Sequence, residues 1–405
     1  MAQNPFRSIV YLTYDLQYHL ALDPDRAKPR PGPFHLFNLA LHFINGILLF
    51  LLIGRLARGS KLLPFAATAI FWVHPLCTES VNFISARFTL MASLFYLAAV
   101  YFYLDPQTRK LPSFLFWLCF LLGLACKETV ATLPLSLALL NHVQKRPQRW
   151  IIPSFLLIAL YIVLRLNWPI ILSSHEDGRV GPMTYFLTQN IYLWLYGLKG
   201  FFPFHLNFDY HNHYSFPCLI PFFIINIGLV LLLLRAAYKR SFWAAIPLFF
   251  LILLLPTSSF IPLDDPFRES RAYLPTMVTS GVLARLFSSS ENSRIRKKIT
   301  YLIIFLSVLV ILCGITRDRN RVWESPALLW RDAVTKSPLK HRPVYNYANA
   351  LRRNLRLESA LIYYQRAHKL DPDHLNTIRN IDLVKKALAS PELEKWKAHL
   401  RSKAP

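Results

Sequence analysis

Long apolar runs recur along most of this 405-residue chain, and they constrain its fold more than any other feature. Each run has about 17 to 22 residues, the length that an α-helix needs to cross roughly 30 Å of hydrocarbon. Because open sheets leave backbone groups unsatisfied in lipid, the sequence predicts an all-α, polytopic membrane helical bundle. We expect about ten spans, at residues 35–54, 63–81, 86–104, 111–125, 129–141, 150–166, 218–234, 241–262, 273–287 and 299–316.

The basic residues predict how this bundle is oriented. They cluster in every second loop if segment 184–202 does not span: Arg55, Arg58 and Lys61; Arg109 and Lys110; Lys145, Arg146 and Arg149; Arg235, Lys239 and Arg240; Arg285, Arg294, Arg296, Lys297 and Lys298. The positive-inside rule places these loops in the cytoplasm and both termini on the opposite side. Segment 184–202 is rich in tyrosine and could span, but this pattern favours a helix lying in the interface.

The net charge of +24 would also suit a nucleic-acid-binding protein. Its distribution follows membrane topology instead, so we expect no nucleic-acid partner. With this topology the polar motifs gather on the non-cytoplasmic side, including His175, Glu176 and Asp177 in the loop before segment 184–202.

The chain changes character near residue 317, where the apolar runs stop. From there to the end it carries 19 Lys and Arg against 9 Asp and Glu. Residues 341–374 fit a tetratricopeptide repeat, in which small residues let two helices approach and a proline ends the second. The matching positions are Ala360, Tyr364, Ala367 and Pro372. We therefore predict an interfacial segment at 1–34, a transmembrane domain at 35–316 and a soluble helical tail at 317–405, which packs on the membrane domain or on a partner.

The cysteines and histidines indicate no metal site. The five cysteines are scattered and form no CxxC pair. The stretch from His205 to His213 holds three histidines and Asp209, which could bind a metal. Its interleaved aromatic residues favour an interfacial belt.

The first candidate motif joins His74, Pro75, Thr78 and Glu79 to Arg87, at the end of a predicted span. Charged groups at this depth are costly unless they pair or act. Arg87 could hold a phosphate with two hydrogen bonds, and Glu79 could position it or contact a sugar. The alternative is a helix break at the interface with solvated charges.

The second motif, Lys127-Glu128, lies between two apolar runs with almost no loop. Lys127 could neutralise a phosphate that Glu128 orients. The alternative is a tight turn from which the lysine reaches the interface.

The third motif, Arg268-Glu269-Ser270-Arg271-Ala272-Tyr273, precedes another span. Two arginines that flank a carboxylate can bind a phosphate, or they can simply pair with the carboxylate.

Taken in order, these motifs resemble a known family. His74-Pro75 with Thr78-Glu79 and Arg87, then Cys126-Lys127-Glu128-Thr129, then Glu269 to Pro275, and finally a repeat tail follow one another as in the transmembrane and tetratricopeptide-repeat proteins. That group includes the protein O-mannosyltransferases of the endoplasmic reticulum and bacterial relatives, within the GT-C glycosyltransferases. Phe6 to Tyr14 and His35 to His42 are similar to the family's first interfacial helix and following span.

The resemblance implies a membrane glycosyltransferase that uses a polyprenyl-phosphate-linked sugar as co-substrate and no other cofactor. A hydroxyl of a protein or glycan would accept the sugar on the non-cytoplasmic face, here the periplasmic side of a bacterial inner membrane. A carboxylate would act as general base, and cationic residues would stabilise the departing phosphate. The positions that match are Glu79 and His74 as catalytic candidates, and Arg87, Lys127, Glu128, Glu269, Arg271 and Tyr273 as donor contacts.

The resemblance also implies an earlier span and an acidic outer loop that supplies the base, and this sequence begins at the interfacial helix. Three explanations stay open: a start codon placed too late, an inactive truncated relative, or a base supplied elsewhere, for example by Glu79. Two other functions compete with the enzyme. One is a scaffold whose tail binds an envelope protein, and the other is a transporter of lipid-linked glycans, which would need polar groups near the midplane.

Overall fold

The computed structural model describes residues 5–23, 28–57, 59–105, 110–148, 150–167, 181–211, 216–288 and 295–390. The regular structure of these residues is helical, apart from one antiparallel pair of two-residue strands, β1 (Leu22–Asp23) and β2 (Lys28–Pro29). The predicted all-α class is thus confirmed. The chain divides into two compact units. The first holds residues 1–204 and 214–317, and the second holds residues 205–213 and 318–405.

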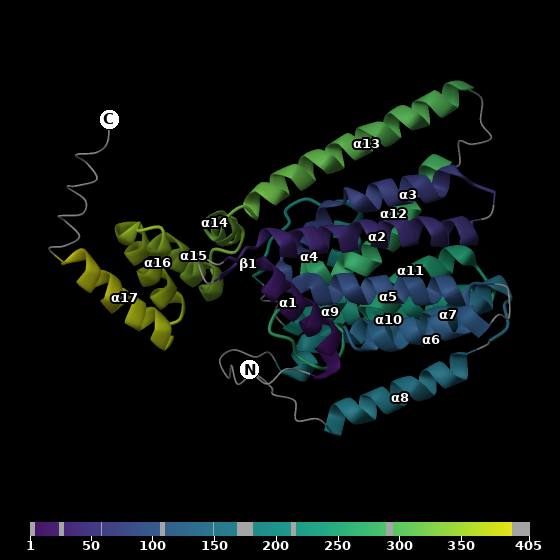
Figure 1. The fold of residues 1–405 in the computed structure, drawn as a ribbon, viewed down its shortest axis with the longest axis horizontal. Coiled ribbons are helices and arrows are strands. Elements are labelled where there is room, and N and C mark those ends of the chain that lie inside the picture. Colours follow the sequence, from purple (N-terminus) through teal and green to yellow (C-terminus); the bar gives the residue numbers. More distant parts are fainter. Residues whose placement is uncertain are drawn as a thin grey trace. The chain divides into compact units, whose positions relative to one another are not determined.

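The first unit is a bundle whose helices run roughly parallel in Figure 1. In chain order they are α1 (Ser8–Ala21), α2 (Gly32–Leu56), α3 (Leu62–Trp72), α4 (Thr78–Asn82), α5 (Arg87–Tyr103), α6 (Lys110–Leu124), α7 (Leu133–Gln144), α8 (Ile151–Asn167), α9 (Pro182–Phe201), α10 (Phe216–Tyr238), α11 (Phe242–Leu254), α12 (Tyr273–Ser288) and α13 (Ile295–Val322). Helix α2 packs on α3 and α5, α3 packs on α12, and α5 packs on α6.

Among the described residues, four helical segments are long and apolar enough to cross a membrane: Gly32–Leu56, Ile84–Tyr103, Leu219–Tyr238 and Ile295–Val322. Leu36, Phe43 and Ile47 on α2 are exposed, as expected for side chains that face lipid. These features support a membrane protein. The count of about ten spans stays a prediction, because the other apolar helices are shorter.

Three predicted spans are shorter helices than the sequence suggests. The span at 63–81 ends as a helix at Trp72, because Pro75 has no N–H to continue it, and the chain proceeds through η2 (Pro75–Cys77). The span at 129–141 becomes α-helical only at Leu133, after η4 (Glu128–Thr132). The span at 241–262 ends at Leu254, shortly before Pro256. Two of these breaks carry the first and second motifs.

Polar side chains on α2 join the helices of the bundle from inside. Asn38, His42 and Asn45 recur on one face and are buried. The hydroxyl of Tyr273 hydrogen-bonds to His42 Nδ1 at 2.8 Å and accepts from Asn45 at 3.2 Å. Because buried polar groups need partners, these contacts fix the register of α2 against α12.

The second unit contains α14 (Pro326–Lys336), α15 (His341–Arg353), α16 (Leu357–Leu370) and α17 (Leu375–Leu388), each packed on the next. Ala333, Ala360 and Ala367 are fully buried, where small side chains let the helices approach. Two of these helices, α15 and α16, occupy the predicted repeat at 341–374. Its assignment as a tetratricopeptide repeat stays a prediction.

The stretch from His205 packs within the second unit, although the sequence analysis places it in the transmembrane domain as an interfacial belt. Phe208 lies edge-on to Trp323 and Trp330, each with ring centroids 5.3 Å apart. The carboxylate of Asp209 is buried and accepts from Lys340 and, at 2.6 Å, from Arg342. His213 of this stretch, like His175, Glu176 and Asp177, lies outside the described residues.

Candidate functional site

Three short 3-10 segments carry the predicted motifs: η2, η4 and η5 (Glu269–Ala272). Lys127 and Arg268 precede η4 and η5 in extended conformations, with φ of −160° and −149°. This backbone turns their side chains out of the helical register. Segment η2 packs on η5, and η4 packs on α5 and α11. The first and third motifs therefore meet, and the second lies against α5 and α11.

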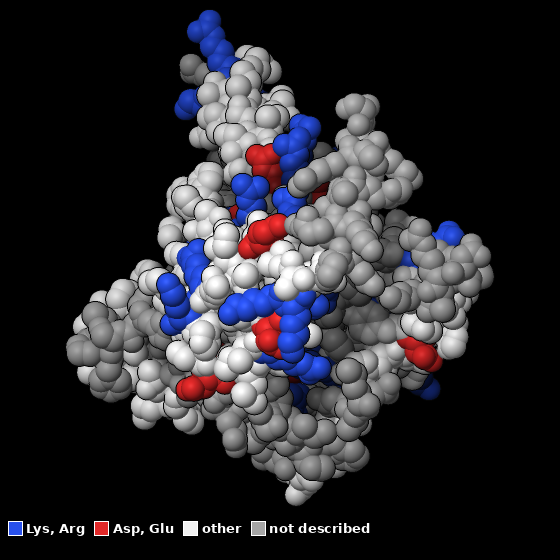
Figure 2. All heavy atoms as spheres, turned by 90° about the vertical axis from the view of Figure 1, so that its left-hand side faces the viewer, with Lys and Arg blue, Asp and Glu red and all other residues white. Residues whose placement is uncertain are grey.

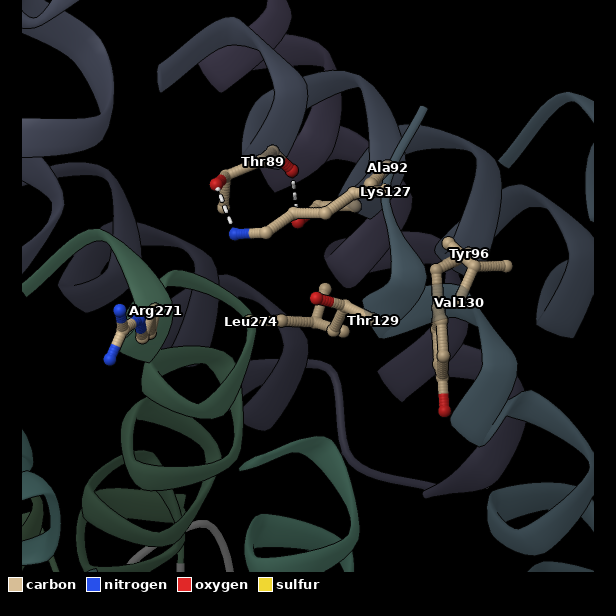
Figure 3. A pocket seen from close by; sticks show the side chains of 9 residues that line it. Thr89, Ala92, Tyr96, Lys127, Thr129, Val130, Arg271 and Leu274 are labelled. Carbon is tan, nitrogen blue, oxygen red and sulfur yellow. Dashed lines mark hydrogen bonds between the residues drawn. The ribbon is translucent and has the colours of Figure 1, made fainter. Parts of the chain in front are cut away.

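Lys127 and Arg271 line one small pocket with Thr89, Ala92, Ser93, Tyr96, Thr129, Val130 and Leu274 (Figure 3). The Lys127 ammonium donates to Thr89 Oγ1 at 2.9 Å. The Arg271 guanidinium donates to the carbonyl of Pro266 at 3.0 Å and also interacts with the hydroxyls of Tyr185 and Tyr196. The cavity volume is about 10 Å³, enough for a single water molecule.

The buried surroundings of Lys127 make its ammonium unusually acidic. Burial lowers its pKa to about 8, and the positive charges of Arg271, Arg7 and Arg268 act in the same direction, while Glu128 opposes them. The surroundings of Lys127 thus oppose its charged form. A bound anion would stabilise that form, so the site favours an anionic ligand.

The surroundings of Glu128, in contrast, favour its charged form. Burial opposes its charge, but Arg7, Lys127 and Arg165 outweigh this effect and lower its pKa to about 2. One of its carboxylate oxygens lies 3.4 Å from an Arg7 nitrogen and 3.5 Å from an Arg165 nitrogen. Glu128 therefore remains ionised and holds two arginines at the edge of the site.

An apolar groove lies next to this ion cluster. Its volume is about 210 Å³, and its walls come from η1 (Pro5–Arg7), α6 and α8. The lining residues are Pro5, Phe6, Leu121, Leu124, Ala125, Leu157, Leu160, Tyr161 and Leu164. Arg165 donates to the Tyr161 hydroxyl at 2.8 Å, which links the groove to Glu128. The apolar groove therefore lies beside cationic groups.

On the face shown in Figure 2, basic and acidic side chains lie close together amid uncharged surface.

Glu79 is fully buried and joins the first motif to the third. Its carboxylate accepts from Arg268 Nε at 2.8 Å, from the Ser270 hydroxyl at 3.0 Å and from the Ser270 N–H at 3.2 Å. These contacts clamp η5 to α4. The oxygens of this buried carboxylate thus accept three hydrogen bonds, and a catalytic role of Glu79 stays a prediction.

The imidazole of His74 is hydrogen-bonded to backbone groups on both of its nitrogens. Its Nδ1 accepts from the Leu76 N–H at 3.2 Å, and its Nε2 donates to the Gly200 carbonyl at 3.2 Å. One nitrogen that accepts and one that donates define a neutral imidazole. His74 thus fixes η2 to the end of α9, and its catalytic role stays a prediction.

Arg87 is fully buried, and the structure surrounds its guanidinium with protein partners. It donates to Asn38 at 3.0 Å, Thr13 at 3.1 Å and Gln17 at 2.5 Å, and it lies over the Tyr14 ring at 4.3 Å. These contacts join α5 to α1 and α2. Arg87 is not among the residues that line the Lys127 pocket, and its phosphate contact stays a prediction.

Tyr273 and Glu269 also lie inside the protein. The Tyr273 hydroxyl is engaged by His42 and Asn45, as described above, and Glu269 is fully buried in η5. Of the predicted donor contacts, the structure brings Lys127 and Arg271 to one pocket and places Glu128 beside it.

Comparison with known proteins yields relatives that share most of the chain. A mouse protein named protein O-mannosyl-transferase TMTC3 is 24% identical over 97% of this chain and 48% of its own length. The human protein of that name is 23% identical over 95% of this chain and 47% of its own. The Caenorhabditis elegans protein O-mannosyl-transferase F38B6.6 is 22% identical over 92% and 55%.

This chain resembles the protein O-mannosyl-transferases. The resemblance predicted from the ordered motifs is thereby confirmed. The chain spans about half the length of the first of these relatives. No family model matches the sequence, and no solved structure matches it.

Two arginines at the site were not singled out from the sequence. Arg7 lies in the N-terminal stretch that was quoted only as an interfacial helix, and Arg165 ends an apolar run. A single arginine at the end of a span usually indicates only which side of the membrane that end occupies. Only the fold shows that both converge on Glu128.

Proposed function

We propose that this protein is a membrane glycosyltransferase that moves a sugar from a polyprenyl-phosphate donor to a hydroxyl of a protein or glycan on the non-cytoplasmic face. One observation carries the proposal: Lys127 and Arg271 line a common pocket beside an apolar groove, in a chain that resembles protein O-mannosyl-transferases. The groove offers a place for the polyprenyl chain, and the cations offer a place for its phosphate.

The reaction would proceed by exchange at the anomeric carbon of the sugar. The acceptor oxygen forms a bond to that carbon and gives up its proton to a base. The bond between the carbon and the phosphate oxygen breaks, and the lipid phosphate leaves with the electron pair. Negative charge thus grows on the phosphate, where Lys127 and Arg271 stabilise it more strongly than in the ground state.

The small volume of the pocket sets a condition for binding. A cavity of about 10 Å³ admits one water molecule, so a phosphoryl oxygen would take the place of that water. Lys127 would exchange its hydrogen bond with Thr89 for a charge-assisted one to phosphate, which is shorter and stronger. Arg271 would contribute its positive charge at the wall of the pocket.

The test is transfer by the full chain in lipid nanodiscs. Polyprenyl-phosphate mannose with a radiolabelled sugar serves as donor, because the relatives are named for mannosyl transfer. A threonine-containing peptide serves as acceptor. Lys127→Met and Arg271→Met should each lower the rate by about 100-fold or more, as expected for the loss of one charge-stabilising donor. The matched control is Lys239→Met, on an exposed lysine outside the pocket.

Normal transfer by both pocket variants would reject the proposal. The competing scaffold predicts that both variants keep the function of the gene in cells, whereas deletion of residues 318–405 abolishes it. A result of that kind would assign the function to the tail.

A further inference from the structure

The turn between α15 and α16 exposes a leucine among arginines. It reads Arg352, Arg353, Asn354, Leu355 and Arg356, and all of these except Arg352 are exposed. Leu355 is 56% exposed, although its neighbours Leu351 and Leu357 are buried. A large apolar side chain surrounded by cations in this way is not part of the core of the second unit.

The backbone makes this leucine more unusual. Helix α15 ends in a Schellman motif, in which the Arg356 N–H donates to the Leu351 carbonyl and the Leu355 N–H donates to the Arg352 carbonyl, both at 3.0 Å. Leu355 takes the left-handed position with φ of 59°. Glycine or asparagine usually fills that position, because a larger side chain meets the backbone there. Leucine at this position therefore makes the turn less stable than glycine or asparagine would, so the stability of the fold does not explain the leucine.

The basic character of this end extends to α17. Val384 and Leu388 near the end of α17 share one apolar cluster with Leu351 and Leu357, so Lys385 belongs to the same end of the unit. Lys386 is paired with Asp382 at 2.8 Å, and Glu358 is the acidic residue that follows the turn. We name the group formed by Arg352, Arg353, Leu355, Arg356 and Lys385 the basic tip.

The second unit is joined in sequence to a helix that could cross a membrane. Helix α13 is one of the four segments long and apolar enough to cross a membrane, and it ends at Val322. Residues 318–322 at the end of α13 already belong to the second unit, and α14 begins at Pro326. A cationic surface with an exposed apolar side chain is the composition that binds the interface of anionic lipids, where the cations meet headgroup phosphates and the apolar group enters the acyl boundary.

We propose that the basic tip is a binding site for anionic lipid headgroups at the membrane surface. Arg353 and Arg356 contact the phosphates, and Leu355 inserts between them. This site is separate from the Lys127 pocket and does not depend on the proposed transfer reaction. It would hold the second unit against the surface in which the donor lipid diffuses.

The experiment measures hydrogen exchange of the backbone amides of residues 353–358 in the full chain. The chain is reconstituted in nanodiscs of phosphatidylcholine alone and of phosphatidylcholine mixed with phosphatidylglycerol. Exchange should be slower with phosphatidylglycerol, by about fivefold for each arginine that contacts a headgroup. The difference should disappear in high salt, which screens charges at the surface.

The double variant Arg353→Gln/Arg356→Gln should abolish the difference between the two lipids. Leu355→Asn should reduce it while keeping the turn, because asparagine adopts the left-handed conformation easily. The control is Leu375→Asn, which removes a 79% exposed leucine from the start of α17 and should leave the difference unchanged. Each variant is compared with itself in the two lipids, so a variant that merely loosens the turn changes both values together.

Equal exchange of the unmodified chain in both lipids would overturn the proposal. Slowing by added poly-glutamate but not by phosphatidylglycerol would also overturn it, and would assign the basic tip to an acidic protein partner.

Discussion

At the scale of single residues, Lys127 offers a test by pH. Its pKa is lowered to about 8, so the ammonium is charged below that pH and neutral above it. Binding of polyprenyl phosphate to the full chain should weaken by about fivefold between pH 8 and 9, because only the charged form attracts the anion. Lys127→Arg should bind with little change over the same interval, since arginine keeps its charge. The measurement is an affinity in nanodiscs at fixed ionic strength, and parallel pH profiles for both proteins would contradict the role of Lys127.

Glu128 is expected to matter for stability, not for proton transfer. Its pKa is lowered to about 2, so the stabilisation is fully present above the ordinary value of about 4.3, declines below it and is lost as the pH falls through 2. Glu128→Gln should lower the free energy of unfolding by about 1–3 kcal/mol at pH 7, because Arg7 and Arg165 lose a charged acceptor. Thermal unfolding in nanodiscs measures the effect. Glu324→Gln, on an exposed glutamate between α13 and α14, should leave the midpoint unchanged.

Single residues also show what the sequence could predict of the site. Lys127 and Arg271 were predicted as donor contacts because charges beside apolar runs are costly without a purpose, and the structure brings both to one pocket. The same argument selected Arg87, whose partners Thr13 and Gln17 are polar and lie more than one helix away in the sequence. A charge at a helix end looks the same in a sequence whether its partner is a ligand or another part of the chain.

At the scale of elements, close packing around η4 depends on Gly123 at the end of α6. A Cβ at this position would lie 2.9 and 3.1 Å from the two methyl groups of Val130 and 3.3 Å from Phe95 Cβ. Val130 is β-branched and fully buried, so it has little freedom to move away. Gly123→Ala should therefore displace η4, lower stability by about 1–3 kcal/mol and weaken donor binding.

Gly228→Ala on α10 is the matched control, because no atom lies within 4 Å of the added Cβ. Both substitutions raise helix propensity by about 1 kcal/mol, so their difference isolates the contact with Val130. Equal thermal midpoints for the two variants would show that η4 adjusts freely.

The helix boundaries show why the elements were predicted only in part. Apolar composition locates the spans well, and α2 and α5 match residues 35–54 and 86–104 to within a few positions. Composition does not report where an apolar run leaves the helix. The 3-10 turns at Pro75–Cys77 and Glu128–Thr132 continue the apolar pattern, so they were included in spans at 63–81 and 129–141. The backbone of the candidate site lies in these turns.

At the scale of the whole molecule, the chain forms two units whose residues are not contiguous in sequence. Residues 205–211 precede α14 by more than 100 positions, yet they belong to the unit formed by the tail. Asn207 donates to the Ser337 hydroxyl at 2.9 Å, and Lys336 donates to the Leu206 carbonyl at 2.6 Å. A pattern of aromatic and histidine residues cannot reveal partners at this separation, which explains why the sequence suggested an interfacial belt there.

This organisation predicts that one buried carboxylate controls the stability of the second unit. Asp209 is fully buried and faces both Lys340 and Arg342. Asp209→Asn keeps the shape but removes the charge that both cations share, and it should destabilise the second unit by about 2–4 kcal/mol. The bundle should keep its own stability, because these contacts all lie within the second unit.

Limited proteolysis of the full chain in nanodiscs separates the two effects. Asp209→Asn should speed cleavage within residues 318–390 by at least tenfold, since a loss of about 1.4 kcal/mol already raises the open population tenfold, and it should leave the loops of the bundle unchanged. Asp382→Asn is the control, because its ion pair with Lys386 joins exposed side chains that contribute little. If Asp209→Asn instead speeds cleavage throughout the chain, the two units unfold together, and the stretch from His205 couples the tail to the bundle.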